Sequence, residues 1–281
     1  MGVMVAMTLY APPPSEQIRT RETFAPAADA GRVRLMTYNV RRCYGMDGKY
    51  APERIARVIA QSGAQIIALQ ELDMNRGRSG AVDQALAIAS VLGMTHHFHP
   101  AMSIAEEHYG DAILSALPLR LVKAAALPGV PLRPRLEPRG ALWVEVPLGD
   151  RTLQVITTHF GLLGRERRLQ AQALLGPEWL GHPACGGPVA LLGDFNAIPA
   201  SGAYRLLTKR LRDVQRLPPF RARATFPSAW PLLRIDHVFV SPELVVRDVT
   251  VLRDGEARVA SDHLPVCVDL ELPPAGPGAT P

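Results

Sequence analysis

The sequence predicts an α/β protein in which two mixed β-sheets pack together and helices cover their outer faces. Three observations support this fold class: apolar runs typical of strands recur along the chain, helical patterns separate several of them, and no long Gly/Ser/Pro linker interrupts residues 31–273. A chain of 281 residues with 47% hydrophobic content can bury a core of that size. We therefore expect one domain over this region.

The first half of the chain alternates between strand and helix patterns. The helix predicted at 52–63 (PERIARVIAQSG) has Pro at its start and Gly at its end, as helix termini often do. Strands are predicted on either side of it, at 33–40 and 64–72, which indicates a strand–helix–strand unit. A further helix is predicted at 82–93 and a strand at 108–119.

The second half begins with a predicted hairpin. Two strands, 141–148 and 151–160, are separated by a Gly-Asp pair that is typical of tight hairpin turns. The later elements are a helix at 165–180 and strands at 190–194, 234–241 and 264–272.

The two ends of the chain have a different composition. Residues 1–30 are rich in Pro and Ala and predict a flexible leader, and residues 274–281 predict a flexible tail. The apolar run of the leader is too short to span a bilayer, and no later segment supplies about 18 uninterrupted apolar residues. Three widely spaced cysteines favour a reducing compartment, so we expect a cytoplasmic protein, with peripheral contact to a membrane as an alternative.

Five apolar strand patterns share a feature: each borders polar residues that can bind metal, phosphate or a proton. These residues are Asn39, Glu71, His159, Asp194 with Asn196, and Asp262 with His263. Because strand ends and the loops beyond them form one rim of a sheet protein, we expect these side chains to converge. The carboxylates are hard oxygen ligands of the kind Mg²⁺ prefers, and the imidazoles can serve phosphate or protons. Hydrolysis of a phosphoester needs this combination, because the phosphoryl charge must be neutralised while a water is activated.

Six short motifs occur in order along the chain: TYNV, LQE, TTHF, GDFN, RIDHVFVS and SDHLPV. Each is weak alone, but together, over residues 33–272, they resemble the endonuclease/exonuclease/phosphatase superfamily, which has the DNase I-like fold. The resemblance is nearer to the bacterial phosphatase-like and sphingomyelinase-like branch than to abasic-site nucleases. It implies a four-layer α/β sandwich and a divalent metal, Mg²⁺ or alternatively Mn²⁺.

The resemblance also implies roles for the site residues. Glu71, helped by Asn39 and Asp262, would hold the metal, and Asp194 would orient or deprotonate the attacking water. Asn196 would position the water and the phosphate, and His159 would stabilise phosphoryl oxygens or assist the leaving group. His263 would contact the scissile phosphate or act as base. Asp236 would hold the useful tautomer of His263.

One position departs from the family pattern. Asp111, in YGDAILS, stands where Asn is common in phosphatase-like branches. Its carboxylate could orient His159 or add negative charge near the metal.

Each of these residues also has an ordinary structural interpretation. Asn39 alone could end a strand in a turn, Glu71 alone could pair with a surface Arg, and single histidines are more often structural than catalytic. The joint pattern reverses that judgement. A zinc site from His97 and His99 is a weaker alternative, because a half-exposed strand end explains THHFHP more simply.

The substrate is the least determined feature. Arg165 and Arg168 follow the strand that carries His159, and Phe226 and Trp230 lie on a loop just before Asp236. Basic and aromatic side chains suit an anionic head group with an apolar body, although each set could instead be solvated or pack its own loop.

Three functions remain open from the sequence. The leading interpretation is a metal-dependent hydrolase of small or lipid phosphoesters, and the first alternative is a DNA nuclease. The net charge of +5 comes almost entirely from Arg and supports a nucleic-acid partner only weakly. The second alternative is a binding module that has lost catalysis. The oligomeric state is left open.

Overall fold

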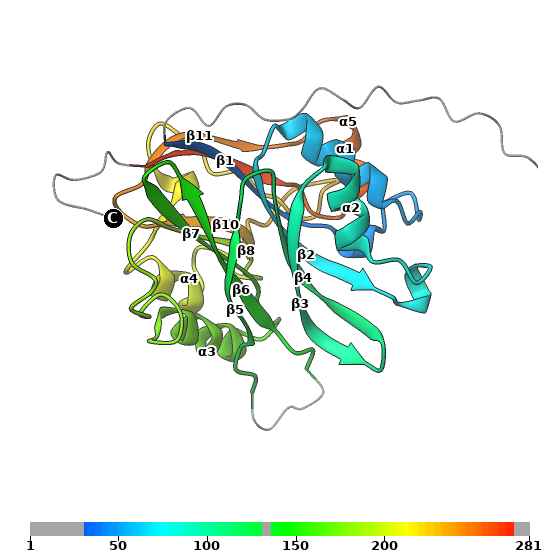
Figure 1. The fold of residues 1–281 in the computed structure, drawn as a ribbon, viewed down its shortest axis with the longest axis horizontal. Coiled ribbons are helices and arrows are strands. Elements are labelled where there is room, and N and C mark those ends of the chain that lie inside the picture. The colour runs from blue at the N-terminus through cyan, green and yellow to red at the C-terminus, as the bar shows by residue number, and fades with distance from the viewer. Residues whose placement is uncertain (1–30, 131–135, 273–281) are drawn as a thin grey trace, which may run out of the picture.

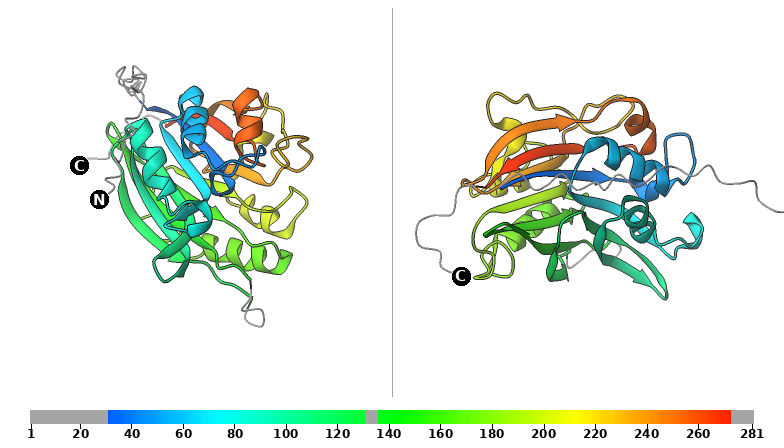
Figure 2. Two further views of the ribbon diagram at one scale, coloured as in Figure 1. Left: turned by 90° about the vertical axis from the view of Figure 1, so that its right-hand side faces the viewer. Right: turned by 45° about the horizontal axis from the view of Figure 1, so that its top comes forward.

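The computed structural model describes residues 31–130 and 136–272. The leader and tail predicted at 1–30 and 274–281 lie outside these residues. Two six-stranded mixed sheets pack against each other, with helices on the outer face of each (Figures 1 and 2). The predicted α/β sandwich, with two packed mixed sheets and flanking helices, is confirmed.

The first sheet has the strand order β11-β12-β1-β2-β4-β3. Its strands are β1 (Arg32–Asn39), β2 (Ile66–Met74), β3 (Thr95–Ile104), β4 (Glu107–Ser115), β11 (Val245–Val251) and β12 (Val266–Glu271). Helices α1 (Pro52–Ser62), α2 (Gln84–Leu92) and α5 (Gly255–Ala260) pack on its outer face through one apolar cluster. Short 3₁₀ turns occupy Arg41–Cys43 and Gly77–Ser79.

The second sheet has the strand order β5-β6-β7-β8-β10-β9. Its strands are β5 (Arg120–Ala126), β6 (Gly140–Leu148), β7 (Arg151–His159), β8 (Val189–Asp194), β9 (Arg212–Asp213) and β10 (Asp236–Val240). Helices α3 (Gly164–Leu175) and α4 (Gly202–Leu207) cover its outer face, and a 3₁₀ turn occupies Val214–Arg216.

The apolar layer between the sheets comes from alternate residues of both. Leu35 and Ile66 of the first sheet meet Leu142, Val155 and Leu192 of the second in one buried cluster. A polar bridge crosses this layer: Thr37 Oγ1 donates to Gln70 Oε1 at 3.3 Å, and Gln70 Nε2 donates to Thr157 Oγ1 at 3.1 Å. Buried polar groups need such partners, and this bridge fixes how the two sheets align near the functional strand ends.

The predicted helices form, with shifted ends that have local causes. The Asp83 carboxylate caps α2 by accepting from Leu86 N at 2.9 Å, so the helix begins after it rather than at 82. The helix predicted at 165–180 ends at Leu175 because Gly176 precedes Pro177 and takes an extended conformation. Within the described residues, no helix combines the length and the apolar character needed to cross a membrane.

Candidate active site

The strand register places three predicted site residues in one row across the second sheet. His159 pairs with Asp194 between the parallel strands β7 and β8, and Asp194 pairs with Asp236 between the antiparallel strands β8 and β10. Gly193 makes the close pairing of β7 and β8 possible, because a Cβ there would lie 1.9 Å from the Thr158 carbonyl oxygen. Asp194 therefore lies between a histidine and a second carboxylate.

The first sheet supplies the opposite wall of the site. Asn39 ends β1, and its Nδ2 donates to Glu71 Oε1 at 2.9 Å and to Asp194 Oδ2 at 3.0 Å. Asn39 Oδ1 accepts from Arg41 N at 3.0 Å, which fixes the orientation of the amide. The buried Asn39 amide thus links one carboxylate from each sheet, although Glu71 and Asp194 lie far apart in sequence.

Glu71 reaches the site through a bulge. The sequence predicted a strand ending near Glu71, but β2 continues to Met74, and its pairing with β4 shifts between Leu69 and Leu72. Glu71 has a φ of 62°, which a non-glycine residue rarely adopts, and bulges commonly redirect a side chain beside an active site. Asn196 also has a positive φ, 47°, which asparagine tolerates better. Backbone strain at both residues is typical of functional positions.

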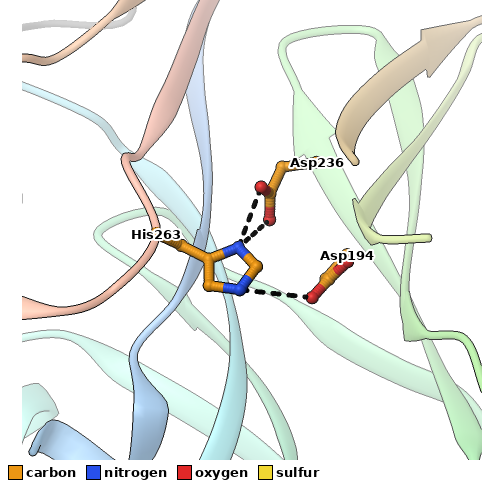
Figure 3. A group of neighbouring side chains, drawn as sticks. All are labelled: Asp194, Asp236 and His263. Atoms are coloured by element: carbon orange, nitrogen blue, oxygen red, sulfur yellow. Dashed lines mark hydrogen bonds and ion pairs between the residues drawn. The ribbon is translucent and has the colours of Figure 1, made fainter. Parts of the chain in front are cut away.

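His263 faces Asp194 from the loop before β12 (Figure 3). Its Nδ1 lies 3.0 and 3.2 Å from the two carboxylate oxygens of Asp236, and its Nε2 lies 3.8 Å from Asp194 Oδ2. Burial alone would lower the pKa of His263, but the Asp236 and Asp194 carboxylates outweigh it and raise that pKa to about 10. The Asp236–His263 contact matches the pair that the resemblance implied.

His159 has different neighbours. Its Nδ1 lies 3.0 Å from Arg139 Nη1, and its Nε2 lies 3.1 Å from Asn196 Nδ2 and 3.5 Å from Asp194 Oδ2. Burial, and then the nearby Arg139 charge, lower the pKa of His159 well below its ordinary value. Both effects favour the neutral imidazole.

Asp194 is the point on which both sheets converge. Asn196 N donates to its Oδ1 at 2.8 Å, and Asn196 Nδ2 also donates to Phe160 O at 2.9 Å. Burial and the adjacent Asp236 raise the pKa of the Asp194 carboxyl. A buried carboxylate on a rigid strand end, with further lone pairs available, can hold a water in a fixed direction.

The oxygens around this point fit a divalent metal. Glu71 offers a half-buried carboxylate, and ligand atoms of Asp194, Asp236 and His263 lie within 4.8 Å of one another. Hard cations such as Mg²⁺ prefer carboxylate oxygen, whereas the imidazole of His263 is already engaged by Asp236. Glu71 beside Asp194 is therefore the better-suited place for the ion.

Asp262 and Asp111 lie at the margin of this group. Asp262 Oδ2 is 3.4 Å from Arg41 Nε, and the neighbouring Ser261 hydroxyl donates to Asn39 O at 2.7 Å. Asp111 is buried on β4, and burial raises its pKa to about 8. Arg139, rather than Asp111, contacts His159 Nδ1, so an orienting role for Asp111 receives no support from the described contacts.

The predicted substrate-binding residues divide into two groups. The Phe226 ring packs against His263 with centroids 4.8 Å apart, whereas Trp230 on the same loop is 74% exposed. Arg165 and Arg168 are exposed on α3, and the Arg168 guanidinium lies beside Gly202 at the start of α4. Their roles stay predictions.

Sequence reasoning missed two hydroxyl groups that support the site. Thr225 Oγ1 donates to Asp236 Oδ2, and Ser261 Oγ accepts from His263 N at 3.3 Å. Ser261 is part of the SDHLPV motif and so could have been noticed, whereas nothing near Thr225 indicates that it reaches Asp236. Arg139 directly precedes a predicted strand, and this position suggests that it faces the site. Its contact with His159 agrees with that expectation, whereas Arg133 and Arg135 of the same basic cluster lie outside the described residues.

Comparison with known proteins agrees with this geometry. The sequence model of the endonuclease/exonuclease/phosphatase family matches residues 36–263. The chain belongs to this family. The matched region starts just before Asn39 and ends at His263, so it contains the whole candidate site.

Relatives and solved structures are similar over much of the chain. The uncharacterized protein YbhP of Escherichia coli K12 is 30% identical over 172 residues, which cover 59% of this chain and 64% of YbhP. The mannosyl-6-phosphatase Bt3783 of Bacteroides thetaiotaomicron is 24% identical, with a TM-score of 0.68 over 85% of this chain and 99% of that one. The human Nocturnin catalytic domain with bound sulfate is 21% identical, with a TM-score of 0.66 over 86% and 94%. The structural likenesses establish the DNase I-like fold.

Proposed function

We propose that this protein hydrolyses phosphoester bonds by direct attack of water with the help of a bound Mg²⁺, which Mn²⁺ could replace. The observation that carries the proposal is the Asn39 amide, which holds Glu71 and Asp194 together while both histidines approach Asp194 Oδ2 within 4 Å. A retained family fold with this complete donor set also argues against a binding module without catalysis.

Each side chain has a defined part in the proposed reaction. A divalent cation at Glu71 would neutralise phosphoryl charge and lower the pKa of a bound water. Asp194 orients the attacking water, and the Asn196 amide positions the phosphate beside it. His159 donates a hydrogen bond to a phosphoryl oxygen, and His263, charged through its contact with Asp236, stabilises the charge that develops on the phosphate. Asp262 assists the cation from the margin.

Removing the Glu71 charge tests the metal site directly. Glu71→Gln should weaken Mg²⁺ binding at least about tenfold in a calorimetric titration, because an amide replaces a charged oxygen ligand. Glu53→Gln, an exposed change in the first turn of α1, is the matched control and should leave the titration unchanged. Equal Mg²⁺ affinity in both variants would remove Glu71 from the metal site.

For the substrate, we propose a small or lipid phosphoester rather than DNA. Trp230 and Leu232 are 74% and 69% exposed on the loop that stacks Phe226 against His263, and Leu162, just after His159, is 69% exposed. Exposed apolar side chains beside a phosphate site suit a substrate with an apolar body, and Arg165 and Arg168 add positive charge nearby. A cytoplasmic location with peripheral membrane contact accompanies this proposal.

Trp230 gives the substrate proposal a sharp test. The chain has three tryptophans, and Trp143 and Trp179 are buried, so a change in fluorescence on adding anionic phospholipid vesicles would report Trp230. Trp230→Ser should slow hydrolysis of a vesicle-embedded phosphodiester about tenfold and leave a soluble chromogenic phosphodiester unaffected. Val91→Ser, at an exposed position of α2, is the control.

Two outcomes would favour the alternatives. Plasmid nicking that needs Asp194, that falls steeply with salt and that no lipid or small phosphoester matches would identify a nuclease. Absence of both Mg²⁺ binding and hydrolysis on every substrate would identify a binding module.

A further inference from the structure

Nitrogen donors approach both ring nitrogens of His159. Arg139 Nη1 lies 3.0 Å from Nδ1, and Asn196 Nδ2 lies 3.1 Å from Nε2. A neutral imidazole has one N–H and one lone pair, so it can accept from only one of these donors. The tautomer of His159 depends on which donor prevails.

Arg139 is the stronger of the two hydrogen-bond donors to His159. A guanidinium is always charged, has no acceptor, and makes hydrogen bonds roughly twice as strong as those of a neutral amide. Arg139 is buried, its Nη1 also lies 2.7 Å from Glu137 Oε1, and its carbonyl accepts from Leu127 N at 2.7 Å, which together fix its position. The Asn196 amide, in contrast, has a second acceptor in Phe160 O.

We infer that Arg139 is a positioning residue that holds His159 as the Nε2–H tautomer and so directs an N–H donor into the site. Among the described residues, the acceptor recorded near His159 Nε2 is Asp194 Oδ2. It lies 3.5 Å away, which is longer than an ordinary hydrogen bond. The proton on Nε2 is therefore available to a phosphoryl oxygen. The assignment of the tautomer is independent of the proposed function, and its catalytic consequence rests on that function.

A competing explanation gives Arg139 a purely electrostatic role. The Arg139 charge also acts on the buried Asp111 carboxyl, lowering its pKa against the effect of burial. This electrostatic effect of Arg139 on Asp111 would not require any particular tautomer of His159. The tautomer itself therefore separates the two explanations.

The test is ¹⁵N NMR of the full chain labelled at histidine, without metal, at neutral pH, where long-range couplings distinguish the two tautomers. The His159 signals are assigned by their loss in His159→Gln. The wild type should show Nε2–H. Arg139→Met should convert His159 to Nδ1–H, because Asn196 is then the remaining donor and points at Nε2. Arg139→Lys keeps a charged donor and should keep the wild-type pattern.

Arg120→Met is the matched control, since Arg120 is an exposed arginine of β5 that pairs with Glu145, and it should leave the tautomer and the activity unchanged. Hydrolysis of a soluble phosphodiester with Mg²⁺ should fall on the order of a hundredfold in kcat in Arg139→Met, with KM nearly constant, as when one transition-state donor is lost. Rescue of kcat is expected in Arg139→Lys.

The wild-type spectrum alone can overturn the inference, even if Arg139→Met fails to fold. An Nδ1–H tautomer or a doubly protonated ring at neutral pH would show that Arg139 does not set the state of His159. A folded Arg139→Met that retains Nε2–H would do the same. Failure of the proposed function would appear differently, as a protein with the expected tautomer and no phosphoester hydrolysis.

Discussion

His159 and His263 both approach Asp194 Oδ2 through Nε2, but neighbours of opposite charge hold the two rings. Arg139 faces Nδ1 of His159, and Asp236 faces Nδ1 of His263. Both rings are buried, and burial alone favours a neutral imidazole in both. Burial and then the Arg139 charge lower the pKa of His159 well below its ordinary value, whereas the Asp236 and Asp194 carboxylates overcome burial and raise the pKa of His263 to about 10.

The difference shows how one residue type can supply two chemistries in a single site. A neutral, oriented N–H suits hydrogen bonding to a phosphoryl oxygen, whereas a charged ring suits stabilisation of a developing negative charge. Asp194 lies within 4 Å of both rings and would hold the water between them. We expect the two histidines to act as these separate parts around Asp194.

The largest effect is expected from removing the group that the two histidines share. Asp194→Asn keeps the size of the side chain but loses the charge that orients water, so kcat should fall at least about a hundredfold. Asp150→Asn, on the exposed turn between β6 and β7, is the control. A loss below tenfold with normal Mg²⁺ binding would mean that the water is positioned by another group.

The next largest effect is expected from variants of His263 and of Asp236, which contacts it. His263→Gln should reduce kcat about tenfold to a hundredfold, and Asp236→Asn should do nearly the same, because the carboxylate acts through the ring. The double variant should cost little more than His263→Gln. His182→Gln, at a ring that packs against Trp143, is the control.

Strictly additive losses in this cycle would show that Asp236 acts without His263. Asp236 would then no longer be the counterpart of Arg139.

The sequence predicted the central strands and the site residues for a shared physical reason. Strands such as β1, β8 and β12 are buried on both faces, so they appear as apolar runs, and polar residues at their ends stand out. Asn39, Glu71, Asp194 and His263 were recognised in this way, and their side chains lie together in the fold.

The edge strands were predicted poorly. β5, β9 and β11 were missed, and of β3 only the first half was anticipated. An edge strand pairs on one side and is often half-exposed, so its pattern is weak: β5 (RLVKAAA) has no buried residue. Its place in the sheet comes from backbone pairing with β6, which the sequence does not reveal.

Two features of the site depend on contacts between distant segments. The positive φ of Glu71 arises where β2 shifts its register against β4, and the Arg139–His159 contact joins the residue before β6 to the end of β7. Neither has a local signature. The sequence therefore identified the two histidines but could not distinguish their charge states.

The smallest effect concerns stability of the metal-free protein, where the two histidines should act in opposite directions. The folded pKa of His263 lies above the unfolded value of about 6.5, so its contribution is complete below that pH and is lost as pH rises through about 10. The pKa of His159 in the folded protein lies below 6.5, so its contribution to the unfolding free energy is lost as pH falls below 6.5. In that range the imidazole is protonated in the unfolded chain but not in the folded one.

Chemical denaturation in EDTA at pH 5, 7 and 9.5 measures both contributions. Relative to wild type, His263→Gln should lose the decline in unfolding free energy between pH 7 and 9.5, and His159→Gln should lose part of the decline between pH 7 and 5. Each change should be at least about 1.4 kcal/mol, the value of one pKa unit. If both variants altered the same limb of the profile, the two rings would share one charge state, and the opposed roles of Arg139 and Asp236 would be wrong.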